Sequence, residues 1–497
     1  MTFYNKFNGV KKIFMFITIG LLFFLYLEMT PREPFYYDSG HYWNLKDTFV
    51  INGNFSFLHY KETLRGYAFP FILYVIAKLA HLIGLDEVVM FYLFSAAMFS
   101  SMICYLFPIS AKLFNKDIDN TQISMFGLLL FYFWRGYFKY PLSDFVSLIF
   151  FILGFVNCLK ISLLGLQQKE LLKDAITLII GIACICFAML IRPIYQATLV
   201  ILIFILIKLL LSTKGMNLKV IITLSILFGV TFGFGPQYYI NTTNHGIHSP
   251  FVQTQLYYKG ESFMQSLMMQ QIRGGFGIQR FESYVGPDGG PPGVRYTDES
   301  GIILRKSMEN NFSVIKSIET VFKKPLDFIA IYMRHLFNGL DVHYSMPYIH
   351  NMQTNRSIFS TLNYGLWFVF ISIFLSLLRR KNQSVKNHSS PLSKKGYKTG
   401  KDNFNEIYSV AVLVTCVLLL TLIGIVGGVE VRFLLPLVYL CYAVVIGHSN
   451  LPFIINNWKS IFTVEKLFAC ILFVAFCFSL STSVAATIQG HVIPNIH

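Results

Sequence analysis

Long apolar runs separated by short polar stretches dominate the chain. A membrane-spanning helix needs roughly 20 mostly apolar residues, and eleven runs come near or exceed that length. These runs cover residues 12–29, 88–113, 121–138, 142–166, 174–191, 194–211, 219–236, 357–378, 406–428, 432–448 and 464–487. The pattern predicts an all-α polytopic membrane protein with about eleven transmembrane helices.

A twelfth apolar stretch, residues 66–85, follows Arg65, contains Lys78 and His81, and is interrupted by Pro70. If this stretch lies flat on the outer surface, every short basic loop falls on one side of the membrane, as the positive-inside rule requires. Those loops lie near residues 6–12, 112–116, 169–173, 208–219, 379–401 and 459–466. We therefore predict an interfacial helix over 66–85, a cytoplasmic N-terminus and an external C-terminus, in the plasma (inner) membrane.

This threading divides the chain into three parts. Residues 1–235 form a membrane core that includes a first outer loop over 28–87, and residues 236–356 form a large extracytoplasmic region. Residues 357–497 hold the C-terminal transmembrane helices and a basic cytoplasmic loop over 379–403. Within the large outer region, the Gly- and Pro-rich residues 286–293 predict an exposed loop. Residues 326–340 predict a helix that lies on the bilayer or dips into it.

Composition supports a membrane protein and excludes several other classes. Hydrophobic residues make up 54% of the chain and charged residues 13%, whereas soluble proteins have about 25% charged residues. The net charge of +16 would suggest nucleic acid in a soluble protein, but here the basic residues lie between apolar runs and set orientation. All eight cysteines fall inside apolar runs, which predicts helix packing rather than disulfides or zinc. Nothing indicates an organic cofactor or a nucleic-acid partner.

Two acids near the predicted outer face of the membrane are candidates for chemistry. Asp38 lies in PFYYDSGHYW, just after the first span, and Asp144 opens the fourth span in KYPLSDFVSL. Each has a simpler interpretation: Asp38 as a solvated loop acid, and Asp144 as a helix-terminal acid with Ser143 as the cap. A carboxylate at the membrane–water boundary, where desolvation raises its proton affinity, can instead act as a general base or hold a cation.

Arginines near the ends of apolar runs are the second kind of candidate. Arg192 precedes Pro193 between two long spans, and Arg432 follows Glu430 in GGVEVRFLLP. An arginine at membrane depth is costly unless it reaches an interface or a partner. Arg192 could simply extend to the interface, and Glu430 with Arg432 could form a local ion pair. Alternatively, these guanidinium groups receive a phosphate, for which their planar fork is well suited.

The order and sidedness of these motifs resemble the polytopic GT-C glycosyltransferases. The nearest likeness is the branch with protein O-mannosyltransferases and aminoarabinose transferases. It rests on YYDSGHYW, on RGYAFPFILYVIAKLAHLIG, on the PLSD that opens the fourth span and on LIRP, and more weakly on EVRFLLPL. The likeness covers about residues 10–235.

The resemblance implies an inverting transfer of a sugar from a polyprenyl-phosphate donor, on the outer membrane face, to a glycan, lipid or protein acceptor. It implies two catalytic residues: Asp38, the acid of the first loop, which activates the acceptor hydroxyl, and Asp144, which shapes the site or helps to bind a metal. Substrate-binding residues would be Arg65, Arg192, Arg432, Tyr37 and His41. Ser39 follows Asp38 where the mannosyltransferases have a second acid. A divalent metal held by Asp38 and Asp144 is therefore left open.

Two other functions remain as alternatives. A polysaccharide polymerase would depend on the arginines of the late outer region, which are Arg273, Arg280, Arg295 and Arg305. A transporter or flippase of lipid-linked sugars would typically have internal repeats, broken helices and acids near mid-membrane. The sequence names neither the sugar nor the acceptor.

Overall fold

The long helices of the structure follow the apolar runs of the sequence. The structure, a computed structural model, describes residues 2–113, 118–166, 170–257, 267–285, 294–308, 314–350, 357–387, 400–427, 429–448 and 463–489. Nine helices among these residues are long and apolar enough to cross a membrane. They are α1 (Thr2–Met29), α4–η3–α5 (Glu87–Ser101, Met102–Leu106, Phe107–Leu113), α7 (Ser143–Leu164), α8 (Leu171–Ile191), η6–α9 (Pro193–Thr198, Leu199–Ser212), α10 (Met216–His245), α16 (Ser357–Asn387), η9–α18 (Val431–Leu434, Leu435–His448) and α21 (Val464–Ala485).

The remaining two predicted spans coincide with α6 (Asn120–Trp134), which has 15 residues, and with α17 (Gly400–Gly424), whose shorter apolar part is Val410–Gly424. All eleven apolar runs are therefore helical, which confirms the prediction of a helical membrane protein. Several boundaries were wrong. α10 continues past Pro236 to His245, and α16 and α17 extend into the loop predicted over 379–403. Residues 388–399 of that loop, and the predicted loop over 286–293, lie outside the described residues.

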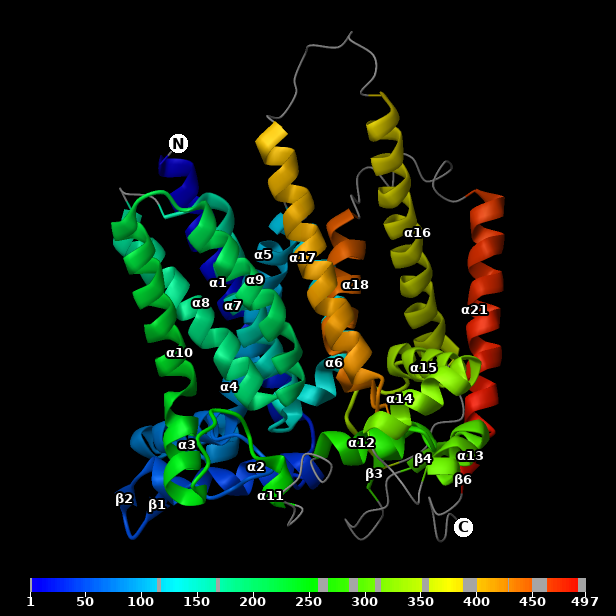
Figure 1. Cartoon of the computed structure of the whole chain (residues 1–497), viewed down its shortest axis with the longest axis horizontal. Coiled ribbons are helices and arrows are strands. Elements are labelled where there is room, and N and C mark those ends of the chain that lie inside the picture. Colours follow the sequence, from blue (N-terminus) through cyan, green and yellow to red (C-terminus); the bar gives the residue numbers. More distant parts are fainter. Residues whose placement is uncertain are drawn as a thin grey trace.

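Short elements gather at one end of the helix bundle, which is the lower end in Figure 1, while α1 begins at the opposite end. We call this group the end layer. Its helices are α2 (Tyr37–Leu45), η1 (Lys46–Phe49), η2 (Phe57–His59), α3 (Ala68–Ile83), η4 (Arg135–Lys139), α11 (Thr254–Tyr257), α12 (Leu267–Gly275), α13 (Glu299–Met308), α14 (Val314–Lys323) and α15 (Pro325–Leu340). The predicted helix over 326–340 is thus present as α15.

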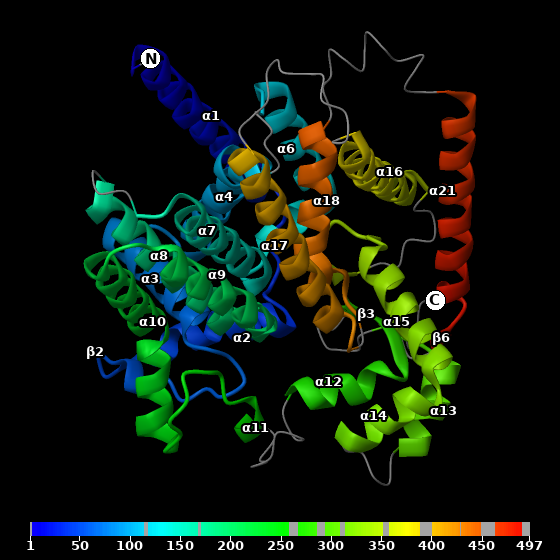
Figure 2. The same cartoon turned by 45° about the horizontal axis from the view of Figure 1, so that its top comes forward.

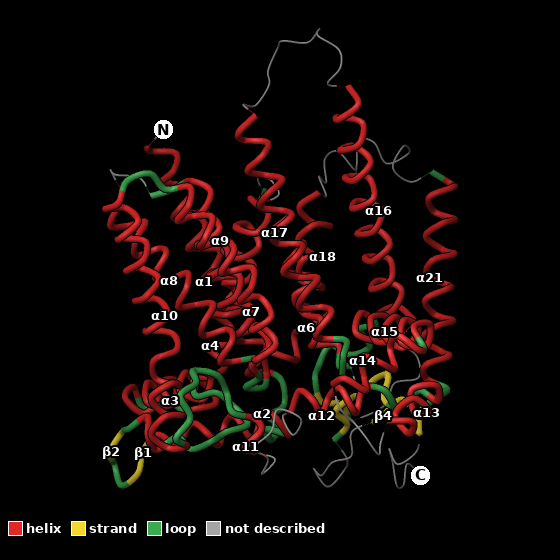
Figure 3. Tube along the Cα trace, viewed as in Figure 1, coloured by secondary structure: helices red, strands yellow, loops and turns green. Residues whose placement is uncertain are grey.

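The end layer also contains all the strands of the described residues (Figure 3), which the prediction of an all-α fold did not include. A hairpin joins β1 (Val50–Ile51) to β2 (Asn54–Phe55) through Asn52 and Gly53, both with positive φ, as a tight hairpin turn requires. A second sheet has the order β5-β3-β4-β6. Its strands are β3 (Ile278–Tyr284), β4 (Val294–Thr297), β5 (Tyr348–Ile349) and β6 (Ile488–Gln489).

Small residues bring the helices of the first half together. A Cβ atom at Gly154 of α7 would lie 2.5 Å from the carbonyl oxygen of Gly181, so only glycine permits α7 and α8 to approach this closely. All eight cysteines lie in helical segments as free thiols, and seven are buried, which confirms their predicted role in packing. By contrast, α21 lies at the edge of the molecule beside α16 (Figure 2) and exposes Phe468 and Phe476. Such apolar surface requires lipid around it.

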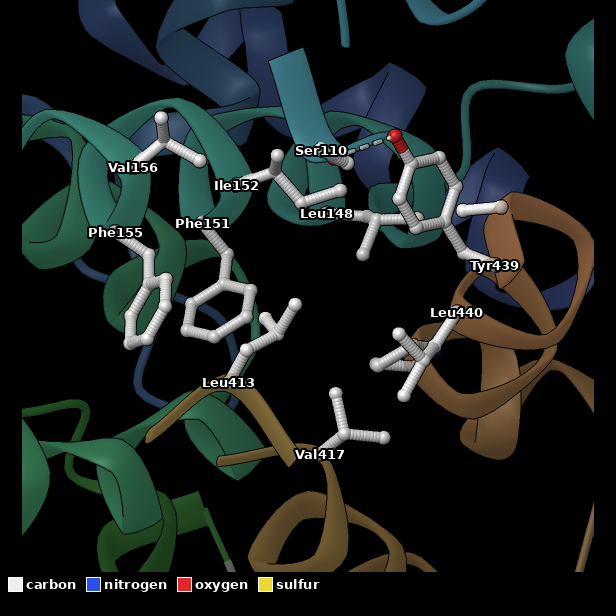
Figure 4. Close-up of a pocket in the computed structure, with 12 residues that line it drawn as sticks. Ser110, Leu148, Phe151, Ile152, Phe155, Val156, Leu413, Val417, Tyr439 and Leu440 are labelled. Carbon is white, nitrogen blue, oxygen red and sulfur yellow. Dashed lines mark hydrogen bonds between the residues drawn. The ribbon is translucent and has the colours of Figure 1, made fainter. Parts of the chain in front are cut away.

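A small apolar cavity lies between α5, α7, α17 and α18 (Figure 4). Its volume is about 20 Å³, enough for one water molecule. Aliphatic and phenylalanine side chains form most of its wall. The polar pair at its edge, Ser110 and Tyr439, is satisfied by a mutual hydrogen bond of 3.0 Å. This cavity is a packing defect of the helix bundle and offers no chemistry.

Candidate functional site

Asp38 lies in the first turn of α2, in the end layer. Tyr37, the first residue of α2, has a φ of 43°, in the left-handed region. That conformation costs a residue other than glycine about 1–3 kcal/mol, so its surroundings must hold it. The Tyr37 hydroxyl donates to the carbonyl of Tyr284, and its ring stacks on Tyr348 with centroids 5.8 Å apart. These contacts fix where α2 begins and hence where Asp38 is placed.

Arg65 is the first cation that contacts Asp38. Its Nη2 atom lies 2.5 Å from Oδ1 of Asp38, and its guanidinium group lies 5.1 Å from the centre of the Tyr42 ring. The next residue makes this placement possible, because a Cβ atom at Gly66 would lie 2.3 Å from the carbonyl oxygen of Leu190. Glycine therefore lets the chain pass directly against the end of α8. This close approach holds Arg65 in the interior of the end layer.

Arg432 connects three acids that are distant in the sequence. It lies in η9, between α17 and α18, and its Nε atom is 2.6 Å from Oε2 of Glu430. The predicted local ion pair is thus confirmed. The same guanidinium group also reaches Oδ2 of Asp38 at 3.0 Å and Oδ2 of Asp144 at 3.7 Å. Arg432 therefore joins the last third of the chain to the first two predicted acids.

Arg192 and Asp144 form the remaining ion pair. Arg192 ends α8 in an extended conformation that the following Pro193 favours, and its Nη1 atom donates to Oδ1 of Asp144. The interpretation of Arg192 as a residue that only extends to the interface was therefore wrong. Asp144 lies in the first turn of α7, whose N-cap is Leu142 without a side-chain hydrogen bond. The alternative in which Ser143 caps this helix was also wrong.

These six residues form what we call the arginine–acid cluster: Arg65, Arg192, Arg432, Asp38, Asp144 and Glu430. Three guanidinium groups balance three carboxylates, so the cluster as a whole is neutral. Access differs within it, because the side chain of Asp144 is only 1% exposed, whereas that of Asp38 is 33% exposed. A ligand from outside would thus meet Asp38 first.

The electrostatic surroundings of Asp38 differ from the prediction. Burial raises the pKa of this carboxyl group, but the charges of Arg65 and Arg432 outweigh it and lower the pKa to about 2. We expected the membrane boundary to raise the proton affinity of Asp38. This expectation was wrong for the observed structure, in which both guanidinium groups contact the carboxylate. In this arrangement Asp38 is an ionised partner of two arginines.

Two predicted substrate-binding residues do not contact the arginine–acid cluster through their side chains. The hydroxyl of Tyr37 is engaged with the backbone of β3 and supports α2, as described above. His41, one turn after Asp38, lies with Nε2 3.2 Å from Oε2 of Glu62, and its side chain is one-third exposed. The sequence motif YYDSGHYW thus divides its side chains between the cluster, the sheet and the surface.

A second ionic site in the end layer was missed in the sequence. Glu33 accepts from Lys139 Nζ at 2.9 Å and from the Tyr140 hydroxyl at 2.6 Å, and its Oε2 lies 3.0 Å from Nε2 of His350. Burial raises the pKa of Glu33, but these three hydrogen bonds lower it to about 2. Only the fold brings these residues together, and no spacing in the sequence indicates it.

A third ionic group lies beneath the second sheet. The guanidinium group of Arg280, on β3, contacts Glu282 and Asp341, and His343 contacts both of these acids. Tyr364 of α16 and Ser481 of α21 donate to Asp341 at 2.7 and 2.8 Å. Because all of these groups are buried, the arrangement joins the sheet to the C-terminal helices. It gives Arg280 a structural role.

The donor set around Asp38 and Asp144 does not favour a metal ion. Among the described residues, no three His, Cys, Asp or Glu side chains are arranged to hold one. Divalent cations such as Ca²⁺ and Mg²⁺ prefer clusters of oxygen ligands, whereas here guanidinium groups already contact both carboxylates. A cation would have to displace them.

Comparisons of the chain with protein-family models, with curated proteins and with solved structures find no match.

Proposed function

We propose that the protein is a membrane glycosyltransferase that moves a sugar from a polyprenyl-phosphate donor to a glycan, lipid or protein acceptor. One observation carries the proposal: three arginines from distant segments converge on the acids Asp38 and Asp144. Such a set of forked cations suits a phosphate. The resemblance of the motifs to GT-C enzymes supplies the class of donor and the inverting course.

The proposal includes the orientation in the membrane. Eleven spanning helices, a cytoplasmic N-terminus and α3 at the outer interface would place the end layer on the extracytoplasmic side of the plasma membrane. The one-sided distribution of basic loops supports this orientation. The amphipathic character of α3 agrees with it, because Leu82 and Ile83 are exposed while Leu73 and Ala80 are buried.

Binding of the donor phosphate would change the state of Asp38. A phosphate that pairs with Arg65 and Arg432 neutralises the two charges that lower the pKa of Asp38. The burial that raises this pKa remains. Asp38 thereby becomes a better base at the moment when the donor is in place. The proposed site thus couples donor binding to the activation of its base.

The proposed step has one base and one leaving group. The acceptor hydroxyl attacks the anomeric carbon of the sugar from the face opposite the phosphate, and its proton passes to the carboxylate of Asp38. The bond between the anomeric carbon and the phosphate oxygen breaks. Polyprenyl phosphate leaves with the electron pair, and Arg65 and Arg432 balance its charge. Asp144 acts as a positioning residue for Arg192 and Arg432.

We propose that this transfer needs no divalent metal, because three guanidinium groups supply the positive charge around the two carboxylates. Transfer in the presence of a chelator tests this part of the proposal. Unchanged activity is the expected result, and complete loss that added Mg²⁺ or Mn²⁺ restores would overturn it.

The test of the function is release of polyprenyl phosphate from a panel of polyprenyl-phosphate-linked hexoses and pentoses. Membranes of the source cells that contain the full chain supply the acceptors. Cleavage of at least one donor is expected, and the Asp38→Asn variant should lack it. Cleavage of none by membranes that hold the folded chain would overturn the proposal, and movement of intact donor across the bilayer would indicate a transporter instead.

A polysaccharide polymerase that uses the late arginines receives less support. Arg280 is buried and ion-paired with Glu282 and Asp341, so it is not available to a substrate in this fold.

A further inference from the structure

A large cavity separate from the arginine–acid cluster lies between α15 and α21, which are neighbours at one edge of the molecule (Figures 1 and 2). Its volume is about 660 Å³, within the range of small-molecule sites, and β3, β4 and the start of α13 close one end. None of its lining residues belongs to the cluster that the proposed glycosyl transfer uses.

The wall of this cavity changes from apolar to polar along α21. Phe473, Phe476 and Leu480 form its apolar part, and Ser483 and Thr487 follow towards the end layer. The span from Phe473 to Val484 corresponds to roughly 16 Å of helix, close to the depth of one leaflet, which is about 15 Å. Because α21 is one of the nine helices that can cross a membrane, the apolar part lies at the depth of lipid chains.

On the facing side, α15 lines the same apolar part with Leu336, Phe337 and Leu340. Met333 also lines the cavity and is 59% exposed, so the space is open at its side rather than enclosed. An opening between two helices at lipid depth admits a molecule that diffuses within the bilayer. The occupant that fits this wall is a lipid chain.

The polar end determines which headgroup fits. Asp298, Glu299 and Arg334 line it, two carboxylates against one guanidinium group, so its net charge is −1. Arg334 is paired with Asp298, whose side chain is fully buried and also accepts from the backbone amide of Gly301 at 3.1 Å. Among the described residues, no ion pair balances Glu299, so a phosphate headgroup would meet its negative charge. An uncharged headgroup with hydroxyl groups can donate to Glu299 and to Ser483 instead.

We propose that this cavity is a binding site for an uncharged glycolipid, with the chain between α15 and α21 and the sugar at Glu299 and Ser483. The charge of its polar end sets it apart from the arginine–acid cluster, which carries three cations. The proposal goes beyond glycosyl transfer, because occupation of this cavity does not depend on a reaction at Asp38.

The test uses the purified full chain in phosphatidylcholine nanodiscs with two photoactivatable lipids that have the same chains, monoglucosyl diacylglycerol and phosphatidylglycerol. We expect labelling of α15 and α21 by the glucolipid to exceed labelling by phosphatidylglycerol about tenfold, the scale of one partly screened like-charge contact. Glu299→Gln should reduce this preference. Equal labelling by the two lipids, or a preference for the anionic one, would overturn the proposal.

A pair of matched variants locates the site on α21. Ser483→Trp fills the polar end of the cavity and should reduce glucolipid labelling about tenfold. Thr482→Trp adds the same side chain on the opposite face of the helix, outside the cavity, and should change nothing. If Ser483→Trp lowers the thermal midpoint, Leu480→Trp repeats the test at the half-buried wall. Labelling that survives in a folded cavity variant overturns the proposal. Asp38→Asn should label like the wild type, so failure here is distinct from failure of the glycosyltransferase proposal.

Discussion

Replacement of Asp38 by asparagine separates the proposed chemical role of this side chain from its role in packing. Asparagine keeps the volume and one acceptor oxygen, but it has neither the charge nor the ability to take a proton at neutral pH. Arg432 retains Glu430 and Asp144 as partners in the variant, whereas Arg65 retains only its contact with the Tyr42 ring. The structural cost should therefore fall mainly on Arg65.

The size of that structural cost follows from the ion pairs. Lowering the pKa of Asp38 from 3.8 to about 2 corresponds to about 2.4 kcal/mol of favourable interaction with the ionised form. One third of the side chain is exposed, so solvent screening reduces this value to about 1–2 kcal/mol. The variant should therefore fold, with a modestly lower thermal midpoint.

The expected loss of activity is larger than this loss of stability. Removal of a general base typically costs roughly 10²–10⁴-fold in rate, which corresponds to about 3–5 kcal/mol in the barrier. Donor binding should weaken little, because asparagine leaves all three arginines in place. The prediction is thus a folded variant that binds polyprenyl phosphate and does not release it from a sugar donor.

Glu33→Gln provides the matched control. Glu33 is also an ion-paired carboxylate of the end layer with a pKa of about 2, but it lies outside the arginine–acid cluster. Its loss should lower stability to a similar extent and leave transfer intact. The assay measures thermal unfolding of the purified variants and release of polyprenyl phosphate by membranes that contain the same variants and supply the acceptors. Equal loss of activity in both variants, or a fully active Asp38→Asn enzyme, would refute the reasoning.

Four further predictions concern Arg65, Gly66, the pH dependence of stability and the orientation of the chain in the membrane. Arg65→Ala should weaken binding of polyprenyl phosphate about tenfold or more, and Arg65→Lys should restore only part of this affinity. Unchanged affinity in both variants would show that Arg65 does not bind the donor. Gly66→Ala should lower stability by about 1–3 kcal/mol and reduce transfer, because its Cβ atom would lie 2.3 Å from a backbone oxygen of α8. A variant with the thermal midpoint and transfer rate of the wild type would contradict this close approach. The ion pairs of Asp38 stabilise the fold above about pH 4 and this contribution is lost as the pH falls towards 2, so the thermal midpoint of the wild type should fall more over that window than that of Asp38→Asn. In intact cells, an impermeant thiol reagent should label Asn52→Cys and not Ser390→Cys, and the opposite result would reverse the proposed orientation.

The helices could be predicted because their signal is local. Each run of about 20 apolar residues has few alternatives to a helix in lipid, so all eleven runs were found. The second sheet gave no such signal, because most of the side chains that β3 buries are polar, among them Gln279, Arg280 and Glu282. Their partners, Asp341 and His343, lie beyond several intervening elements, and only the fold shows that these polar residues are interior.

The residues of the candidate site could be predicted from the sequence, but the contacts between them could not. The positive-inside rule predicted that Asp38 and Asp144 lie on one face of the membrane. Arg192 and Arg432 were recognised because charged residues are rare beside long apolar runs. The contacts between them depend on how α7, α8 and η9 end, which no local pattern encodes. For the same reason the lowered pKa of Asp38 was missed, since it depends on two arginines that lie 27 and 394 residues further along the chain.

The arginine–acid cluster also has a consequence for biogenesis. Arg432 is synthesised 394 residues after Asp38, a delay of roughly 20–80 s at ribosomal rates of about 5–20 residues per second. Each arginine, however, follows an acid of its own: Arg65 after Asp38, Arg192 after Asp144 and Arg432 after Glu430. Each acid therefore gains its arginine after at most 48 further residues, so no insertion intermediate has to keep Asp38 or Asp144 unpaired until the C-terminal helices are made.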